Sequence, residues 1–512
     1  MTAKYKYYYK NFRCFLALLF VCLLQVNGSL LAQKKSNKGK EFWTGYGHNQ
    51  FFTTNQGGGE TMVLYLSAEE PATVTVSING TSFTRTYNIP ANTAIATDPM
   101  PRGLAGGEDA RLYNQGKYDK GIHIVSDTPI VAYAHVYGQT SSGSTMLLPV
   151  ETFGYNYYSV NTEQNYASDA YSWFFVVASE NNTRIRITPS QNTFGINRNQ
   201  AFEVDLQKGE IYNVLGRIQT GTFGFDLTGS YIKSIEGSDG KCHPVGVFSG
   251  SSRTSICANA WASGDFIIQQ VFPSEAWGTE YLTAPTSSTV NATNLNRNRF
   301  RVTVKDRTTV VYRNGVRLTG LVNNFYYEYA SDEADYITAN KPIMVSQIMV
   351  SEGGCGNTGR GDPDMFYISS VPQAVKRTIF YNTNKEGITH NFVTIIVPNG
   401  GLSSLKIDGG TAFSHQYVHP NNNKYTVVVK SLPASQMQHV VECDSGFTAV
   451  TYGMGTAESY GYNAGTFIND LDTKIDFVNT SDKYSVDYTC AGTNFFPQVK
   501  TMYNPTSIVW HF

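Results

Sequence analysis

Residues 63–80 read VLYLSAEEPATVTVSING. An apolar run is followed by a polar turn containing Pro71, and then by apolar residues that alternate with Thr and Ser. Alternation with a period of two puts apolar side chains on one face of a strand, and the polar turn lets two such strands pair. The stretch therefore predicts a β-hairpin with one buried face.

The same pattern occurs three more times along the chain. The matching stretches are FFVVASENNTRIRITPS at 174–190, FRVTVKDRTTVVYRNG at 300–315 and, more loosely, FVTIIVPNGGLSSLKIDGG at 392–410. A short strand, a polar turn and another strand follow each of the four after roughly 50 residues, and the turn contains Pro129, Pro244, Pro342 or Gly446. These markers are spaced by roughly 100 residues, which is the size of one β-sandwich domain.

We expect an all-β fold, built as a tandem array of about four diverged β-sandwich-like units. The unit boundaries are drawn near 39–153, 154–277, 278–376 and 377–470, where opening strands such as GKEFWTGYGHN recur. Each unit contains about seven short strands and no amphipathic helical period, which suits a sandwich. Closure of the units into a β-propeller-like ring is the alternative. The units group as two pairs, 33–277 and 278–470.

The composition excludes some classes of protein. Lys and Arg number 39 against 40 Asp and Glu, so the formal charge of −1 provides no basic field for a nucleic acid. Aromatic residues make up 13% of the 512 residues, which is too many for a disordered chain. We therefore expect a folded protein that does not bind nucleic acid.

The N-terminus has the layout of a secretory signal peptide. Its first thirteen residues contain four basic and no acidic side chains, an apolar run follows at Phe15–Leu24, and Ala32 suits cleavage. The run is shorter than the ~20 residues that span a bilayer, so removal of residues 1–32 is favoured over an uncleaved anchor helix. Because no later apolar stretch reaches that length, we expect a secreted or outer-surface protein whose mature chain has no transmembrane segment.

Export implies an oxidising compartment, in which disulfides are expected. Cys242 and Cys257 flank the short apolar strand Val245–Phe248 and a polar turn, and they are the predicted pair. Closing a loop of ~15 residues would stabilise the fold by about 3 kcal/mol. A zinc site is the alternative, although the cysteines lack ligand spacing. The remaining cysteines, whose pairing stays open, are Cys355, Cys443 and Cys490.

A glycine-rich loop combines two motifs. Gly354, Gly356 and Gly359 have the spacing of a dinucleotide-binding loop, but Arg-Gly-Asp-Pro follows where such a site needs a helix. No cofactor is therefore predicted. Arg360 and Asp362 belong to an Arg-Gly-Asp tripeptide and are the candidates for ligand contact, with a structural turn as the alternative.

The sequence contains no recognised catalytic motif. A GxSxG elbow is absent, and His415 and His419 lie in a loop or strand, where a spacing of four does not build a metal site. We therefore predict no catalytic residue, no metal and no enzyme activity. Clustered aromatic residues are interpreted as core, with sugar stacking as the alternative. They are Tyr155, Tyr157, Tyr158, Trp173, Trp261 and Trp277.

A family resemblance rests on GKEFWTGYGHN at 39–49, GIHIVSDTPIVAYAHV at 121–136, QQVFPSEAWGTEYLTAP at 269–285 and GDPDMFYISSVPQAV at 361–375. Over Gly39–Asn469 the chain resembles the N-terminal domain family named after IgGFc-binding protein. Residues 471–512 look like a linker and the truncated start of a PKD-like domain. The resemblance implies a secreted, multi-domain surface protein of a kind found in Bacteroidota.

We expect a non-enzymatic binding or adhesion module that recognises an extracellular glycan, mucin or surface protein. Export, a near-neutral charge, the β units and the lack of a catalytic motif support this hypothesis. A structural spacer of a large envelope or gliding-associated protein is the alternative, and a secreted hydrolase is the third hypothesis. IgG binding belongs to the protein after which the family is named, and the resemblance does not extend it to this chain.

Overall fold

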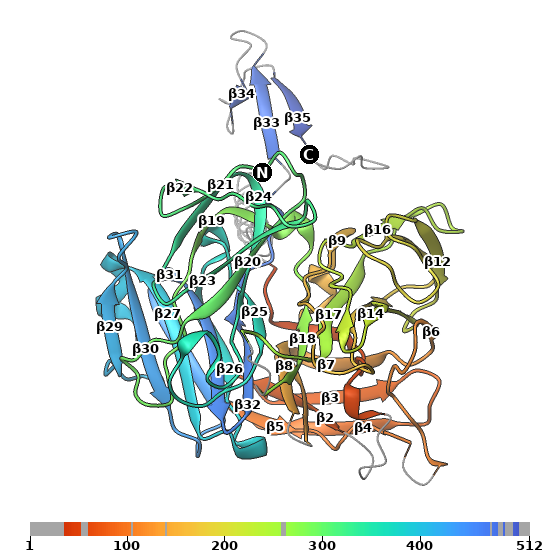
Figure 1. The fold of residues 1–512 in the computed structure, drawn as a ribbon, viewed down its shortest axis with the longest axis horizontal. Helices are drawn as coiled ribbons and strands as arrows, with labels where there is room; N and C mark the ends of the chain where they lie inside the picture. Colours follow the sequence, from red (N-terminus) through yellow and green to blue (C-terminus); the bar gives the residue numbers. More distant parts are fainter. Residues whose placement is uncertain are drawn as a thin grey trace, which may run out of the picture. The chain divides into compact units, whose positions relative to one another are not determined.

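The computed structural model describes residues 35–52, 60–103, 106–138, 141–257, 263–471, 474–479, 485–486 and 495–500. Within these ranges the protein is all-β, and its helices are short 3-10 turns (Figure 1). None of the described helices is long and apolar enough to cross a membrane. The predicted signal peptide, Cys490 and most of the predicted PKD-like start lie outside the described residues.

The first sandwich is organised around one long strand, β7, which takes part in two sheets. Ile122 to Ser126 pair with β3 and partly with β1, whereas Val131 to Tyr137 pair with β2 and partly with β8. Pro129 has no amide hydrogen to donate, and it lies where the register between β1 and β7 shifts. The strands are β1 (Gly39–Thr44), β2 (Thr61–Ala68), β3 (Ala72–Ile78), β4 (Thr84–Ile89), β5 (Thr93–Ala96), β7 (Ile122–Gly138) and β8 (Ser141–Met146).

The same pairing scheme recurs in three further stretches. The long strand is β24 in the third stretch and β31 in the fourth, and each pairs with four other strands. In the second stretch the long strand is interrupted, because residues 236–244 separate β16 from β17. The register shifts beside Pro342 and Gly446 as it does beside Pro129. Three of the four markers, Pro129, Pro342 and Gly446, are therefore points at which one long strand crosses between sheets. The predicted hairpin at residues 63–80 is wrong, because β2 and β3 pair with different segments of β7 and not with each other. The other three predicted hairpins fail in the same way, because their two strands do not pair with each other either.

The strands of these stretches have the following bounds. The second stretch contains β9 (Asn156–Tyr158), β10 (Ser172–Ala178), β11 (Thr183–Thr188), β12 (Phe202–Leu206), β13 (Ile211–Leu215), β16 (Tyr231–Ile235), β17 (Val245–Thr254) and β18 (Asp265–Gln270), with the small hairpin β14 (Ile218–Thr220) and β15 (Phe223–Gly224). The third contains β19 (Gly278–Leu282), β20 (Asn298–Val304), β21 (Val311–Arg313), β22 (Val316–Arg317), β23 (Tyr326–Ser331), β24 (Tyr336–Ile348) and β25 (Met365–Tyr367). The fourth contains β26 (Val375–Tyr381), β27 (His390–Pro398), β28 (Lys406–Ile407), β29 (His415–Val418), β30 (Tyr425–Leu432), β31 (Gln438–Gly455) and β32 (Glu458–Gly465). A separate sheet is formed by β33 (Lys474–Asn479), β34 (Ser485–Val486) and β35 (Phe495–Lys500).

The last strands of the four sandwiches contact one another. β8 contacts β18 and β32, and β25 contacts the same two strands, so the four form a closed cycle of contacts. The side-chain amide of Gln269 in β18 donates to the carbonyl oxygens of Ser144 in β8 (2.8 Å) and Gly461 in β32 (3.0 Å). Such bonds satisfy backbone groups buried between the sandwiches. The units are thus sandwich-like, as expected. The closed cycle of contacts among their last strands resembles the ring of the propeller alternative. The domain boundaries stay a prediction.

Buried tyrosines fill the space between the first and fourth sandwiches. The rings of Tyr65 and Tyr381 stack with centroids 4.0 Å apart, and those of Tyr133 and Tyr462 lie 4.9 Å apart. The Tyr133 hydroxyl donates to the carbonyl oxygen of Ile379 at 2.7 Å. A buried tyrosine is stable when its hydroxyl finds such a partner. Part of the high aromatic content of the sequence is therefore explained by the core.

Candidate binding cleft

A cleft of about 590 Å³ lies between the first and second sandwiches. Its volume falls within the ~300–1,000 Å³ range of small-molecule sites. The wall combines aromatic rings with amide and acidic side chains. It is lined by His48, Tyr113, Asn114, Gln115, Tyr118, Asp169, Tyr171, Phe194 and Leu215.

Residues 113–118 supply one part of the wall, and backbone contacts fix their shape. The short strand β6 (Gly116–Tyr118) pairs with β13, and Gly116 has a φ of 143°, a conformation that favours glycine. The Tyr118 hydroxyl accepts a hydrogen bond from the Asn114 amide (2.8 Å) and donates one to the Asn114 carbonyl oxygen (3.2 Å). The Asn213 side chain donates to the same carbonyl oxygen at 2.9 Å. The segment is therefore held to the second sandwich.

Phe194 supplies another part of the wall and is the most exposed aromatic residue of the lining, with 43% of its surface accessible. Its amide donates to the Leu215 carbonyl oxygen at 3.3 Å, and its carbonyl oxygen accepts from the Gln115 side chain at 2.6 Å. The Tyr171 ring meets the Phe194 ring edge to face, with centroids 5.3 Å apart. An exposed ring on a fixed backbone offers a flat apolar surface to a ligand.

The polar part of the wall contains neutral groups and one carboxylate. His48 is buried with its Nδ1 2.8 Å from the Ser252 hydroxyl, and burial lowers the His48 pKa to about 3, so the ring is neutral. The Asp169 carboxylate accepts a hydrogen bond from the Gln50 side chain at 3.0 Å. The Asn114 residue is exposed. The cleft therefore suits a ligand that has an apolar face and several hydroxyl or amide groups.

The two residues predicted to contact a ligand do not share a surface. Arg360 is exposed, and its guanidinium donates to the Thr456 hydroxyl. Asp362 is only 1% exposed, and its carboxylate accepts a hydrogen bond from the Ser263 hydroxyl at 2.6 Å. Burial raises the pKa of Asp362 to about 7. In the tripeptide the acid is therefore buried while Arg360 is exposed, and ligand contact by Arg360 stays a prediction.

The predicted disulfide between Cys242 and Cys257 is wrong. Cys257 is bonded to Cys355, with Cα atoms 5.2 Å apart, and Cys242 is a free thiol. The reason is that the strand Val245–Thr254 lies between Cys242 and Cys257. Ten extended residues span about 30 Å, whereas a disulfide needs Cα atoms within about 7 Å. The bond instead joins the second sandwich to the third, and Cys443 is buried and free.

Buried acids connect neighbouring central strands rather than forming a site. Asp265 begins β18, and its carboxylate accepts from the Ser142 amide of β8 at 2.6 Å. Asp364 precedes β25, and its carboxylate accepts from the Gly461 amide of β32 at 2.6 Å. Burial raises the pKa of both carboxyl groups. Among the described residues, no group of three or more His, Cys, Asp or Glu side chains could hold a metal ion.

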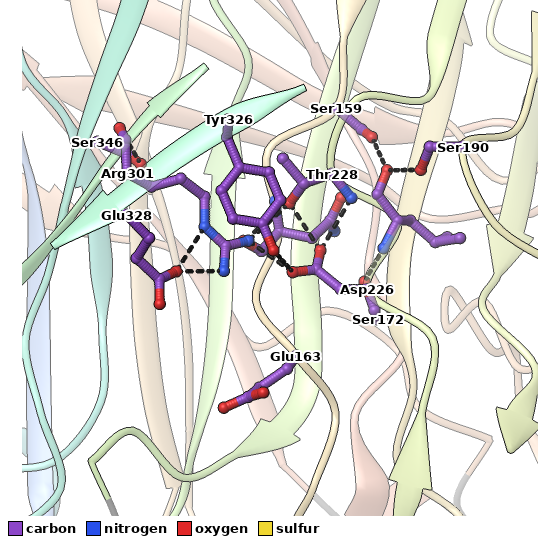
Figure 2. Close-up of polar contacts among 12 residues, drawn as sticks. Ser159, Glu163, Ser172, Ser190, Asp226, Thr228, Arg301, Tyr326, Glu328 and Ser346 are labelled. Carbon is purple, nitrogen blue, oxygen red and sulfur yellow. Dashed lines mark hydrogen bonds and ion pairs between the residues drawn. The ribbon is translucent and has the colours of Figure 1, made fainter. Parts of the chain in front are cut away.

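A second charged cluster joins the second and third sandwiches, as Figure 2 shows. The Arg301 guanidinium in β20 lies 2.6 Å from the Asp226 carboxylate and 2.5 Å from the Glu328 carboxylate. It also donates to the Asn161 carbonyl oxygen at 2.6 Å and lies 3.9 Å from the centroid of the Tyr326 ring. Because these partners satisfy the guanidinium within the protein, we interpret the cluster as a structural link between the sandwiches.

Part of the chain also matches a known family. The model of the IgGFc binding protein family matches residues 143–453, more than half of the chain. The chain belongs to the IgGFc binding protein family. The human IgGFc-binding protein is 22% identical over 435 residues, which cover 83% of this chain. The same residues cover 7% of the human protein, so this chain spans only a small part of its relative's length.

The match to the IgGFc binding protein family includes Asp169, Tyr171 and Phe194 of the cleft, whereas His48 and residues 113–118 precede it. The aromatic residues missed in the sequence are those of the cleft, Tyr113, Tyr118, Tyr171 and Phe194. They lie in irregular segments or at strand ends, where no apolar periodicity marks them. Three of the six aromatic residues that the sequence did single out are confirmed as buried, namely Tyr157, Trp173 and Trp277. Tyr158 is half-buried against the core, Tyr155 is exposed, and Trp261 lies outside the described residues.

Proposed function

We propose that this protein is an extracellular binding module that recognises a glycan, free or carried by a mucin or another glycoprotein, through the cleft around Phe194 and Asp169. The cleft carries the proposal, because it joins an exposed ring to hydrogen-bonding side chains on a fixed backbone. A flat ring covers the apolar face of a sugar, while amides and a carboxylate bind its hydroxyl groups. Membership of the IgGFc binding protein family supports an extracellular binding role.

The composition of the cleft favours binding over hydrolysis. Most glycosidases need two carboxyl groups that flank the scissile bond, one to donate a proton and one to act as base or nucleophile. Among the lining residues of the cleft, Asp169 is the one acid. We therefore propose a non-enzymatic module.

The module is proposed to act outside the cell as part of a longer protein. Residues 1–32 would direct export, and residues 471–512 would lead into a PKD-like domain. A source in the Bacteroidota is part of the same proposal. The human relative is named for binding IgG Fc, and IgG Fc is therefore included among the ligands to be tested.

A structural spacer is the second candidate function. It is supported by the contacts that tie the second sandwich to the third, namely the Arg301 cluster and the disulfide between Cys257 and Cys355. Such links suit a stiff body that holds other domains apart. A spacer requires no ligand in the cleft, so a binding experiment distinguishes the two functions.

Binding of the full chain to immobilised mucins, host glycans, bacterial polysaccharides and IgG Fc tests the proposal. We expect saturable binding of a glycan that persists at high salt, because stacking is not screened by ions. Phe194→Ala should weaken binding about 5- to 160-fold, since stacking of this kind contributes ~1–3 kcal/mol by analogy with base stacking on aromatic residues. Phe223→Ala is the matched control, because Phe223 is also exposed but lies outside the cleft lining. A blank panel, or equal effects of the two variants, would overturn the proposal.

A further inference from the structure

We infer that the cleft selects sugars without negative charge and that Asp169 sets this selectivity. The inference rests on the proposed function, because it concerns the class of glycan that binds. The favoured ligands are neutral hexoses and N-acetylhexosamines, and the disfavoured ones are sialylated or sulfated sugars.

The charges of the lining residues point to this class. The lining contains no Lys or Arg side chain among the residues that the structure describes, and its acid is Asp169. His48 is neutral because burial lowers its pKa to about 3. The remaining lining side chains are aromatic, amide or aliphatic. Among the described lining side chains, an anionic ligand would therefore meet the Asp169 carboxylate and no cation.

Three basic side chains close in sequence to residues 113–118 have partners of their own. The Lys117 ammonium lies 2.6 Å from the Glu210 carboxylate. The Lys120 ammonium donates to the Arg111 carbonyl oxygen at 3.1 Å. The Arg111 guanidinium lies 2.9 Å from the Asp109 carboxylate. To pair with an anionic sugar, each of these cations would have to leave an existing contact.

The chemistry of Asp169 suits hydroxyl groups. An ionised carboxylate is an acceptor with about four lone-pair sites, so the hydrogen bond from Gln50 leaves capacity for a ligand. Sugar hydroxyls donate to such acceptors. A carboxylate or sulfate group of a ligand that lies next to Asp169 would bring two negative charges together as water is removed. Such like-charge repulsion weakens the binding of an anionic ligand.

The test uses oligosaccharides released from one mucin preparation and separated by charge into a neutral pool and an acidic pool. Binding of both pools to the full chain is compared for the wild type and Asp169→Asn, which keeps the shape and removes the charge. We expect the wild type to bind the neutral pool at least about tenfold more tightly, a ratio that one like-charge contact can supply. Asp169→Asn should reduce this ratio to less than about threefold. Removing sialic acid from the acidic pool should restore its binding.

Asp444→Asn is the matched control, because Asp444 is exposed in the fourth sandwich and outside the cleft lining. It should leave the ratio unchanged. Binding of the acidic pool as tightly as the neutral pool would overturn the inference while the proposed function stands. An unchanged ratio in Asp169→Asn would also overturn it. If neither pool binds, the inference is wrong. If no member of the whole panel binds, the proposed function is wrong as well.

Discussion

Replacement of Arg301 by Met tests whether the charged cluster in Figure 2 is a structural link. Arg301 is only 3% exposed, and the side chains of its partners Asp226 and Glu328 are 12% and 21% exposed. Removing the cation leaves the poorly hydrated Asp226 carboxylate without a counter-charge, whereas Glu328 keeps its ion pair with Arg299 at 3.0 Å. The loss of one partner from a buried ion pair costs about 3–5 kcal/mol, and we expect a loss of that size in the free energy of unfolding.

Scanning calorimetry measures the effect. Unfolding entropy is ~2.1 cal/mol/K per residue near 60 °C, so cooperative unfolding of the four sandwiches, ~440 residues, has an entropy of ~0.9 kcal/mol/K. A loss of about 4 kcal/mol then lowers the melting temperature by about 4 °C. Arg186→Met is the control, because Arg186 pairs with Glu203 at the surface and such pairs contribute less than about 1 kcal/mol. A shift for Arg301→Met no larger than that of the control would refute the interpretation.

Other variants and conditions probe the disulfide and the buried acids. The double replacement of Cys257 and Cys355 by Ser should lower the free energy of unfolding by up to about 4.7 kcal/mol, the chain-entropy value for a loop of ~100 residues. Denaturant titration measures this, and an unchanged midpoint contradicts it. Between pH 6.5 and 9 the melting temperature should fall, because burial raises the pKa of Asp362 to about 7, of Glu458 to about 8 and of Glu60 to about 9. The folded chain then binds more protons than the unfolded chain, in which these acids ionise near pH 4, so stability decreases as pH rises. A melting temperature that rises between pH 6.5 and 9 would contradict this assignment of raised pKa values to the buried acids.

The sequence predicted the local parts of the fold. Alternating apolar residues predicted the strands, because a strand with one buried face leaves that pattern in the chain. Their pairing as hairpins was wrong, since β2 and β3 pair with different segments of β7 and not with each other. The turns predicted at Pro129, Pro342 and Gly446 were wrong, because each of these residues lies within one continuous strand. The markers could not show that this strand crosses between two sheets, since crossing depends on pairing with strands distant in sequence.

The contacts between sandwiches were beyond the sequence. Cys257 pairs with Cys355 across 98 residues, and spacing along the chain gives no sign of this. Asp362 resembled an exposed ligand contact, but its inward direction is set by Ser263 and the neighbouring central strands. The cleft was missed for the same reason. Phe194 and Tyr118 come from distant parts of the sequence, and only the folded chain, in which β6 pairs with β13, brings them together.

The most direct measurement is a crystal structure of the full chain with the tightest-binding oligosaccharide from the panel. The proposal predicts a sugar ring in van der Waals contact with the Phe194 ring, with hydroxyl groups donating to the Asp169 carboxylate. A sugar bound elsewhere, such as at the loop that carries Arg360, with the cleft left empty, would contradict it.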